Sequence, residues 1–360
     1  MPESRKDELA VALIGAGAFG ARRAAAVAGS GRSSLVVVAD SAVQRAGELA
    51  DSVGALALPD WRAAIECTDV GAVIISTPTH LAPKIALAAL AAGKHVLAEK
   101  PFGRAAREIE SAIELAAERQ LVLKVGYNHR YHPAIAKAHE LVAQGVIGRP
   151  LFLRCVYGHG GRPGYEKEWR SRPEISGGGQ LLDQGVHALD LFRWFAGEFA
   201  EASALLSTSF WPVAPVEDNV FAMLRTRDGV VAQLHASWTQ WKNTFSLEIV
   251  GESGSLGVTG LGRSYGPERL VQHTRPELGG PPEEDHLALP PDCDSLALEW
   301  NDFLDAVERG GEPMSSGADA WRTLRLVDAL YRSAREGRVV RLEPAAEFAS
   351  GCRAERVVVQ

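Results

Sequence analysis

The stretch "LAVALIGAGAFGARRAAAVA", from Leu9 to Ala28, predicts the fold of the first third of the chain. It begins with an apolar run typical of a buried parallel strand and ends with an alanine-rich run typical of a helix. Between the two runs stands Gly15-x-Gly17-x-x-Gly20, the glycine spacing of a dinucleotide-binding turn. The stretch therefore predicts the strand, turn and helix that open a Rossmann domain.

Each glycine of this turn has its own physical task. Gly15 permits the tight turn, Gly17 lets the backbone approach a pyrophosphate, and Gly20 lets the helix pack on the strand. The helix N-terminus favours the negative charge of the phosphates. We therefore expect a nicotinamide dinucleotide here, with a ligand-free glycine turn as the alternative.

Asp40 predicts which dinucleotide is bound. It lies 20 residues after Gly20, at the end of the predicted strand 34–40. Its carboxylate would accept hydrogen bonds from the ribose hydroxyls and repel a 2′-phosphate, so we expect NAD, with NADP less favoured. Arg45, on the next predicted helix, would soften that preference.

The periodicity of the chain changes near residue 128. Before it, the strand patterns 70–77, 94–100 and 121–127 alternate with helical patterns at 83–93 and 107–120, which predicts a parallel α/β sheet. After it, the run 230–239 alternates with period two behind an Asp228-Gly229 turn, which predicts an antiparallel sheet with helices on one face. The Gly-, Pro- and Glu-rich stretch 262–294 predicts a long surface loop, followed by two closing helices.

The amino-acid composition argues against some classes of binding partner. The net charge of −7 argues against general binding of nucleic acid, which needs a concentrated basic surface. The N-terminus lacks the form of a signal peptide, and no apolar window is long enough to predict a membrane span. The four cysteines form no Cys-x-x-Cys pair, as expected of reduced thiols in a cytoplasmic protein; they are Cys67, Cys155, Cys293 and Cys352.

Two further stretches carry candidate chemistry. Lys100 ends the strand 94–100, and the carboxyl ends of strands in an open parallel sheet face the ligand crevice. The stretch "GGGQLLDQGVHALDLF" (177–192) places Asp183, His187 and Asp190 along one face of a predicted helix, after glycines that would let the backbone approach a ligand. These three residues are interpreted as metal ligands, catalytic groups or a satisfied polar patch. A metal site is least favoured, because no further ligand cluster completes it.

Four pieces together resemble the glucose-fructose oxidoreductase, inositol dehydrogenase and rhizopine-catabolism (Gfo/Idh/MocA) family. They are "GAGAFG" with Asp40, "STPTH" (76–80), "AGKHVLAEKP" (92–101) and "GGGQLLDQGVHALD" (177–190). The resemblance runs from Val11 to about Leu342. It implies a Rossmann NAD(P)-binding domain over 9–127, an α+β substrate-binding and oligomerisation domain with a large open, mostly antiparallel sheet over 128–345, and a tail over 346–360.

The resemblance also implies the site residues. The catalytic group would be Lys100, Asp183 and His187. The cofactor-binding group would be Gly15, Gly17, Ala18, Phe19, Gly20, Asp40, Ser76, Thr77, Pro78, His80, Glu99, Lys100 and Asn128. The substrate group would be Lys100, His129, Arg130, Trp169, Arg170, Asp183, His187 and Asp190. Many relatives carry a second histidine where this chain has Ala82.

The chemistry of alcohol oxidation agrees with these residue types. Hydride removal from a carbinol carbon needs a base for the hydroxyl proton, and an imidazole such as His187 titrates near neutral pH. Asp183 would orient that imidazole and stabilise its protonated form. Lys100 would stabilise developing alkoxide charge. In the reductive direction, His187 would donate the proton.

The expected substrate is a secondary alcohol of a sugar, amino sugar or cyclitol, oxidised to a ketone. The polar aromatic stretch 159–170 favours a sugar or an aminoglycoside of antibiotic biosynthesis, and inositol or a simple monosaccharide of catabolism is the alternative. A non-catalytic sugar sensor and a glycosidase with transiently reduced NAD are further alternatives within the family. A homodimer or homotetramer through the C-terminal sheet is expected.

Overall fold

The computed structural model describes residues 8–290 and 294–344, which form two compact units. Within these ranges, the first unit holds 8–127 and 296–321, and the second holds 128–290, 294–295 and 322–344. The predicted tail 346–360, together with Cys293 and Cys352, lies outside the described residues.

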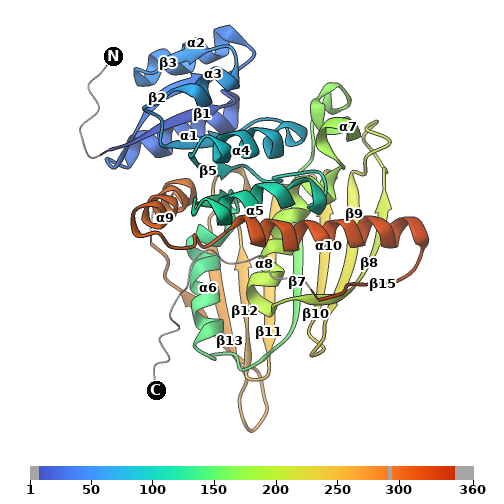
Figure 1. The fold of residues 1–360 in the computed structure, drawn as a ribbon. Coiled ribbons are helices and arrows are strands. Elements are labelled where there is room, and N and C mark those ends of the chain that lie inside the picture. The colour runs from blue at the N-terminus through green and yellow to red at the C-terminus, as the bar shows by residue number, and fades with distance from the viewer. Residues whose placement is uncertain (1–7, 291–293, 345–360) are drawn as a thin grey trace. The chain divides into compact units, whose positions relative to one another are not determined.

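The first unit is built on a parallel six-stranded sheet with the order β3-β2-β1-β4-β5-β6. Strands β1, β2, β3 and β5 of this sheet are labelled in Figure 1. The order changes direction at β1 and β4, as in a doubly wound Rossmann fold, so the predicted fold class is confirmed. The strands are β1 (Leu9–Ile14), β2 (Ser33–Ala39), β3 (Leu56–Leu58), β4 (Ala72–Ile75), β5 (His95–Ala98) and β6 (Leu123–Val125).

Helices follow the strands of the first unit as the sequence patterns predicted. They are α1 (Ala18–Gly29), α2 (Val43–Val53), α3 (Trp61–Glu66), α4 (Ala82–Ala91) and α5 (Glu110–Glu118). The helix predicted over 83–93 is α4, with a proline in its first turn and Gly93 at φ +75° just after its end. The helix predicted over 107–120 is shorter, because Arg107 and Glu108 lie in a 3₁₀ turn, Ala106–Glu108.

The helix α9 (Ser295–Arg309) packs on the first unit, which corrects the predicted domain boundary. Trp300, Phe303 and Leu304 are buried in the same core as Val11 and residues of β2. The indole of Trp300 also donates a hydrogen bond of 3.0 Å to the hydroxyl of Ser33. Amphipathic spacing predicts that a helix has a buried face but does not say which sheet that face covers.

The second unit contains a nine-stranded sheet with the order β14-β13-β12-β11-β7-β10-β9-β8-β15. Of its paired strands, β7 and β10 run parallel and the others run antiparallel, as predicted. The strands are β7 (Pro150–Gly158), β8 (Phe199–Ser207), β9 (Asn219–Thr226), β10 (Val231–Ser237), β11 (Thr244–Gly251), β12 (Gly254–Thr259), β13 (Arg269–Thr274), β14 (Glu283–Leu287) and β15 (Val340–Arg341).

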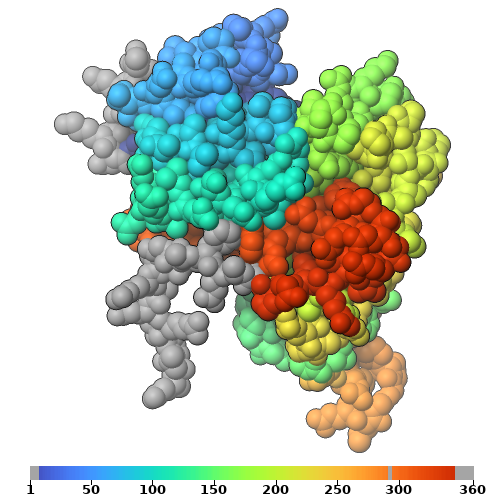
Figure 2. All heavy atoms as spheres, turned by 45° about the vertical axis from the view of Figure 1, so that its right-hand side comes forward, coloured from blue at the N-terminus to red at the C-terminus, as the bar shows by residue number. Residues whose placement is uncertain are grey.

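The predicted surface loop over 262–294 is wrong in part, because it contains β13 and β14. Most of β14 is exposed and its sequence, Glu283-Glu-Asp-His-Leu287, has no apolar alternation, so its pairing with β13 left no hydrophobic signal. The connection 275–282 between the two strands projects from the sheet in both views (Figures 1 and 2).

Helices cover one face of this sheet. Figure 1 shows α6 (Pro133–Ala143) and α8 (Val186–Ala196) against it, where α6 contacts β12 and β13 and α8 contacts β7. The short helix α7 (Pro173–Ser176) precedes α8, and α10 (Gly317–Glu336) is the second predicted closing helix. None of the helices in the described ranges is long and apolar enough to cross a membrane.

Candidate active site

The glycine turn of the first unit has the geometry that its sequence predicted. Gly15 has φ +100°, and a Cβ at this position would lie 2.4 Å from the carbonyl oxygen of Ser76. A Cβ on Gly20 would lie 2.0 Å from the carbonyl oxygen of Gly15. Around Gly17, by contrast, no atom outside its neighbours in the chain lies within 4 Å of the Cβ position. The turn thus needs glycine at Gly15 and Gly20 for the fold, and it leaves open space at Gly17.

Asp40 closes one side of this turn. Its carboxylate accepts a hydrogen bond of 2.8 Å from the backbone N–H of Ala16 and another of 2.8 Å from that of Ala42. Arg45 donates from Nη2 to Oδ1 at 2.8 Å and from Nε to Oδ2 at 3.2 Å. Although burial alone would raise it, the pKa of Asp40 is lowered by these hydrogen bonds. A dinucleotide ribose would therefore meet a charged carboxylate already engaged by Arg45.

Two buried polar atoms after β4 fit a bound ligand. Thr77 Oγ1 and His80 Nδ1 are buried and have no hydrogen-bond partner among the described residues. Buried polar atoms are rarely left without a partner. They follow Ser76, whose N–H donates to Ile14 at 2.7 Å, so they lie at the carboxyl end of the sheet near the turn. The open space at Gly17, the charged Asp40 and these two atoms fit NAD.

Glu99 forms a buried ion pair that no sequence pattern indicates. Arg23, on α1, donates from Nε to Glu99 at 2.5 Å and from Nη2 to Glu299 of α9 at 2.5 Å, and all three side chains are largely or fully buried. Burial raises the pKa of Glu99, while the charge of Arg23 opposes the rise. The cluster joins α1, the end of β5 and α9 directly beside Lys100, whose peptide bond to Pro101 is cis. Contact of Glu99 with the cofactor stays a prediction.

Two of the glycines 177–179 of the second unit lie against protein atoms. A Cβ on Gly178 would lie 1.9 Å from the hydroxyl of Tyr331, and one on Gly179 would lie 2.0 Å from the carbonyl oxygen of Glu217. The Glu217 carboxylate also accepts hydrogen bonds from the N–H of Leu181 at 2.9 Å and the hydroxyl of Tyr331 at 2.8 Å. Gly178 and Gly179 therefore allow protein atoms to pack closely, and the approach of this backbone to a ligand stays a prediction.

The helix predicted through Asp183 begins with a π-helical turn. Leu181–Gly185 is π-helical and continues into α8 at Val186. π-Helical turns inside helices occur often at functional sites. Asp183 therefore lies in the π turn and His187 in the first turn of α8, so their spacing of four differs from that on a regular α-helix.

His187 lies against a second imidazole. Its ring is buried and stacks on the ring of His129, with centroids 3.8 Å apart and an interplanar angle of 22°. Nε2 of His129 lies 3.1 Å from the hydroxyl of Tyr157, and Nδ1 lies 3.3 Å from Oδ1 of Asn128. The structure thus brings together three predicted site residues, Asn128, His129 and His187. Tyr157, in strand β7, was missed because an aromatic residue in a strand usually indicates core.

Asp183 is surrounded by groups suited to a polar ligand. Its Oδ2 lies 3.9 Å from Nε of Arg170, whose guanidinium lies over the ring of Trp169 at 4.6 Å. Burial and then the charge of Asp183 raise the pKa of Tyr165. Burial also raises the pKa of Tyr265, with a smaller effect from Asp183. Arg170, Trp169 and Asp183 are all partly exposed, so a ligand in solution can reach them.

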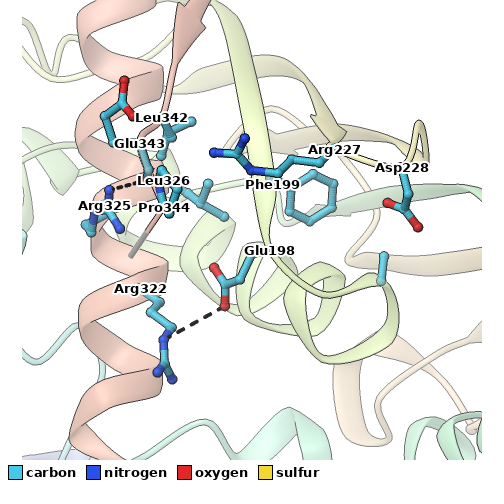
Figure 3. Close-up of a pocket in the computed structure, with 11 residues that line it drawn as sticks. Glu198, Phe199, Arg227, Asp228, Arg322, Arg325, Leu326, Leu342, Glu343 and Pro344 are labelled. Atoms are coloured by element: carbon cyan, nitrogen blue, oxygen red, sulfur yellow. Dashed lines mark hydrogen bonds and ion pairs between the residues drawn. The ribbon is translucent and has the colours of Figure 1, made fainter. Parts of the chain in front are cut away.

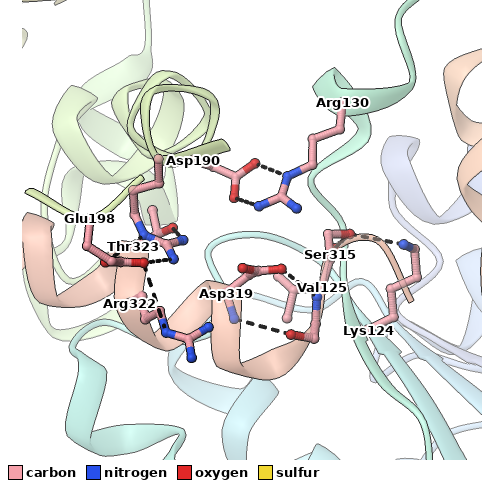
Figure 4. Close-up of polar contacts among 11 residues, drawn as sticks. Lys124, Val125, Arg130, Asp190, Glu198, Ser315, Asp319, Arg322 and Thr323 are labelled. Atoms are coloured by element: carbon pink, nitrogen blue, oxygen red, sulfur yellow. Dashed lines mark hydrogen bonds and ion pairs between the residues drawn. The ribbon is translucent and has the colours of Figure 1, made fainter. Parts of the chain in front are cut away.

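Arg130 and Asp190 pair with each other, and their contact with substrate stays a prediction. Arg130 donates from Nε and Nη2 to the two carboxylate oxygens of Asp190 at 2.8 and 2.6 Å (Figure 4). Both side chains are buried, at 4% and 1% exposed. A buried charge is retained only with a partner, and each of these residues supplies that partner to the other. The pair ties the segment that carries His129 to the helix that carries His187.

A separate pocket lies at one end of the second unit. Its volume is about 220 Å³, and Arg322, Arg325, Arg227, Glu198 and Glu343 line it (Figure 3). Arg322 lies 4.0 Å from Glu198, and Arg325 donates to the carbonyl oxygen of Glu343 at 2.7 Å. No predicted catalytic, cofactor or substrate residue lines this pocket.

The described side chains contain no group of three or more His, Cys, Asp or Glu residues arranged to hold a metal ion.

Both halves of the chain match models of one protein family. Residues 9–127 match the oxidoreductase family with an NAD-binding Rossmann fold, and residues 135–257 match the GFO/IDH/MocA C-terminal domain. The chain belongs to the Gfo/Idh/MocA family. The resemblance stated from the sequence is therefore confirmed, and so are the Rossmann fold, NAD as cofactor and the assignment as an oxidoreductase.

Similar proteins of this family include enzymes named for sugars. The levoglucosan dehydrogenase of Pseudarthrobacter phenanthrenivorans is 29% identical over 340 residues, which cover 83% of this chain and 87% of that protein. The 1,5-anhydro-D-fructose reductase of Ensifer adhaerens is 32% identical over 280 residues, covering 76% and 80%. A solved structure of levoglucosan dehydrogenase in complex with NADH has a TM-score of 0.86 at 28% identity and covers 94% of this chain and 100% of its own.

Proposed function

We propose that this member of the Gfo/Idh/MocA family oxidises a secondary alcohol of a sugar, amino sugar or cyclitol to a ketone with NAD. The observation that carries the proposal is the environment of His187. Its buried ring stacks on His129, and the partly exposed Asp183 stands one turn earlier in the chain with Arg170 beside it. A base next to groups that bind hydroxyls is the arrangement that alcohol oxidation needs.

We assign the steps to three residues. His187 removes the proton of the substrate hydroxyl, and Asp183 stabilises the imidazolium that results. Lys100 stabilises the negative charge that develops on the substrate oxygen. NAD, when bound at the glycine turn, supplies the hydride acceptor. In the reverse direction, His187 returns the proton as the ketone is reduced.

For the substrate, the partly exposed groups favour a polyhydroxylated ring. The guanidinium of Arg170 and the carboxylate of Asp183 suit hydroxyls, and the ring of Trp169 suits the apolar face of a sugar. The carboxylate would also suit an amino group, which supports the amino sugar within this class. The names of the levoglucosan and anhydrofructose enzymes support a sugar rather than a non-carbohydrate alcohol.

A panel of substrates tests this function. Purified protein is incubated with NAD or NADP and levoglucosan, monosaccharides, inositols or aminoglycosides, and NADH or NADPH is followed by absorbance. We expect NADH from at least one sugar or cyclitol and loss of that signal in Lys100→Ala. Cleavage of a glycoside without net NADH would favour the NAD-dependent glycosidase. Sugar binding without turnover would favour the sugar sensor.

We also propose a homodimer or homotetramer formed through the face of the nine-stranded sheet that the helices leave open. Leu205, Phe221 and Met223 lie on neighbouring strands of this face and are 76%, 49% and 47% exposed. Phe221 also stacks on His235 at 4.2 Å. Exposed apolar side chains gathered on one face are typical of an interaction surface.

We also propose that the protein works in the cytoplasm. The free thiols Cys67 and Cys155 support a reducing compartment of this kind.

Light scattering after size-exclusion chromatography tests the proposed assembly. Phe221→Asp should convert the oligomer to a smaller species, because a charge would have to be buried at the interface. Arg227→Ala, an exposed change outside that apolar group, is the control and should leave the mass unchanged. A wild-type monomer would contradict the proposal.

A further inference from the structure

Two exposed aromatic side chains of the second unit lie side by side. Phe210 and Trp241 are 60% and 68% exposed, more than any other Phe, Trp or Tyr of the described ranges. Their ring centroids are 4.8 Å apart, and the ring of Phe210 also lies 5.1 Å from that of Trp211. Exposed apolar side chains that gather in one place indicate a binding surface, whereas scattered ones do not. Phe210, Trp211 and Trp241 are called the aromatic platform below.

Buried hydrogen bonds hold much of the aromatic platform in place. The carboxylate of the buried Asp218 accepts from the N–H of Phe210 at 2.8 Å and from that of Trp211 at 3.0 Å. Although burial alone would raise it, the pKa of Asp218 is lowered by its hydrogen bonds. The indole of Trp211 donates to the carbonyl oxygen of Trp238 at 2.9 Å. Rings fixed in advance lose little conformational entropy when a ligand binds.

The aromatic platform lies at the end of the sheet from which the predicted sugar-binding stretch, 159–170, begins. Ser237, the last residue of β10, pairs with Gly158, the last residue of β7, and with the first residue of β9. The connections 208–218 and 238–243, which carry the platform, therefore meet the sheet at the same end as the stretch 159–170.

Close contacts join the aromatic platform to this stretch. A Cβ on Gly161 would lie 2.4 Å from Nε1 of Trp211, so the backbone passes directly against the indole. The ring of Tyr165 lies 6.2 Å from the ring of Trp211. Burial and then the charge of Asp183 raise the pKa of Tyr165, so that carboxylate lies near the same phenol. Tyr165 thus links the platform to the carboxylate that is proposed to act in the reaction.

We propose that the aromatic platform binds a second sugar ring, so that the substrate is a glycoside with one ring oxidised beside His187 and the next stacked on the platform. The inference rests on the proposed function for the ring that is oxidised. A sugar ring offers an apolar C–H face to aromatic rings and hydroxyls to polar neighbours. The exposed Lys242 and the partly exposed Asn243 follow Trp241 and supply such neighbours. A protein partner would need a wider apolar surface.

Binding of matched sugars tests the proposal without any need for turnover. Glucose is compared with maltose, cellobiose and trehalose, and 2-deoxystreptamine with kanamycin, by calorimetry in the presence of NADH. We expect at least one multi-ring sugar to bind about three- to tenfold more tightly than its single ring, from the usual size of stacking contacts. Equal or weaker binding of every multi-ring sugar would overturn the proposal. Failure of the proposed function would show separately, as absence of NADH in the substrate panel.

A matched pair of variants tests the stacking contact. Trp241→Ala should weaken the multi-ring sugar by about three- to tenfold and leave the single ring within about twofold, because the first ring does not touch the platform. Trp241→Phe keeps a ring and should retain most of the affinity. Leu278→Ala, at a fully exposed apolar side chain of the connection 275–282, is the control and should change neither affinity. Equal losses for both sugars in Trp241→Ala, or no loss, would contradict the proposal.

Two further measurements separate a sugar from other causes. Asp218→Asn should weaken the multi-ring sugar more than the single ring, because Asp218 positions Phe210 and Trp211 without touching the ligand. A merely structural role would lower both affinities equally, and that result would contradict the assignment of Asp218. Light scattering of Trp241→Ala should give the wild-type mass. Conversion to a smaller species would show that the platform faces a second copy of the chain, which would overturn the proposal.

Discussion

The chain has two runs of glycine that each lead into a helix, and the two differ in what occupies the space beside them. At Gly17, in the first unit, a Cβ would meet no atom outside its neighbours in the chain within 4 Å. At Gly179, in the second unit, a Cβ would lie 2.0 Å from the carbonyl oxygen of Glu217. The space beside Gly17 is open to a ligand, whereas protein atoms occupy the space beside Gly179. Glycine in a motif therefore indicates close approach but does not tell what approaches.

The substitution with the largest expected effect should slow the reaction at the second unit and leave cofactor binding at the first unit unchanged. His187→Ala should lower turnover by about 10²-fold or more, from the usual size of general acid–base catalysis. The affinity for NADH, measured by fluorescence titration, should stay within about threefold of wild type. Turnover near the wild-type value would contradict the assignment of His187 as the base.

A pair of alanine substitutions tests the comparison of the glycines directly. Gly179→Ala should lower the free energy of unfolding by about 1–3 kcal/mol or more, because its Cβ has no room. Gly17→Ala should leave that free energy within about 0.5 kcal/mol and weaken NADH about tenfold, since its Cβ enters the space left for the pyrophosphate. Chemical denaturation and NADH titration of both variants provide the two measurements. A wild-type free energy of unfolding in Gly179→Ala would contradict the claim that protein atoms fill the space beside Gly179.

The smallest expected effect is a change in the preference for NAD over NADP, at the residue beside the glycine turn of the first unit. Asp40→Ala should weaken NAD relative to NADP by roughly tenfold, because a charged hydrogen-bond acceptor for the ribose is lost. The ratio of kcat/KM for the two cofactors measures it. Arg62→Ala removes an exposed ion pair with Asp60, elsewhere in the first unit, and serves as the control. An unchanged ratio in Asp40→Ala would mean that another group selects the cofactor.

The first unit was predictable from its sequence because its signals are local. Buried strands of a parallel sheet are continuous apolar runs, and the turn from Gly15 to Gly20 lies within one short stretch. The placement of α9 was not predictable, since its apolar stripe fits either sheet. The strand β14 was missed because it pairs at an exposed edge without an apolar face.

The candidate site was predictable in its residue types and less so in its contacts. His129 and His187 lie 58 positions apart in the sequence (187 − 129), and nothing local shows that their rings stack. Asp190 looked like a ligand group beside His187, yet its partner is Arg130, a long-range contact that the helix pattern cannot show. Tyr157 and Tyr265 carried no signal that distinguished them from core aromatics. Long-range pairing of polar groups was the information that the sequence lacked.

The central claim is that this chain transfers a hydride from a sugar or cyclitol alcohol to NAD, with His187 as the base. The most direct measurement compares NADH formed with ketone formed when the wild-type protein acts on the best substrate of the panel. We predict one NADH for each ketone and loss of both in His187→Ala. Product formation without NADH, or equal yields from the wild type and His187→Ala, would contradict the claim.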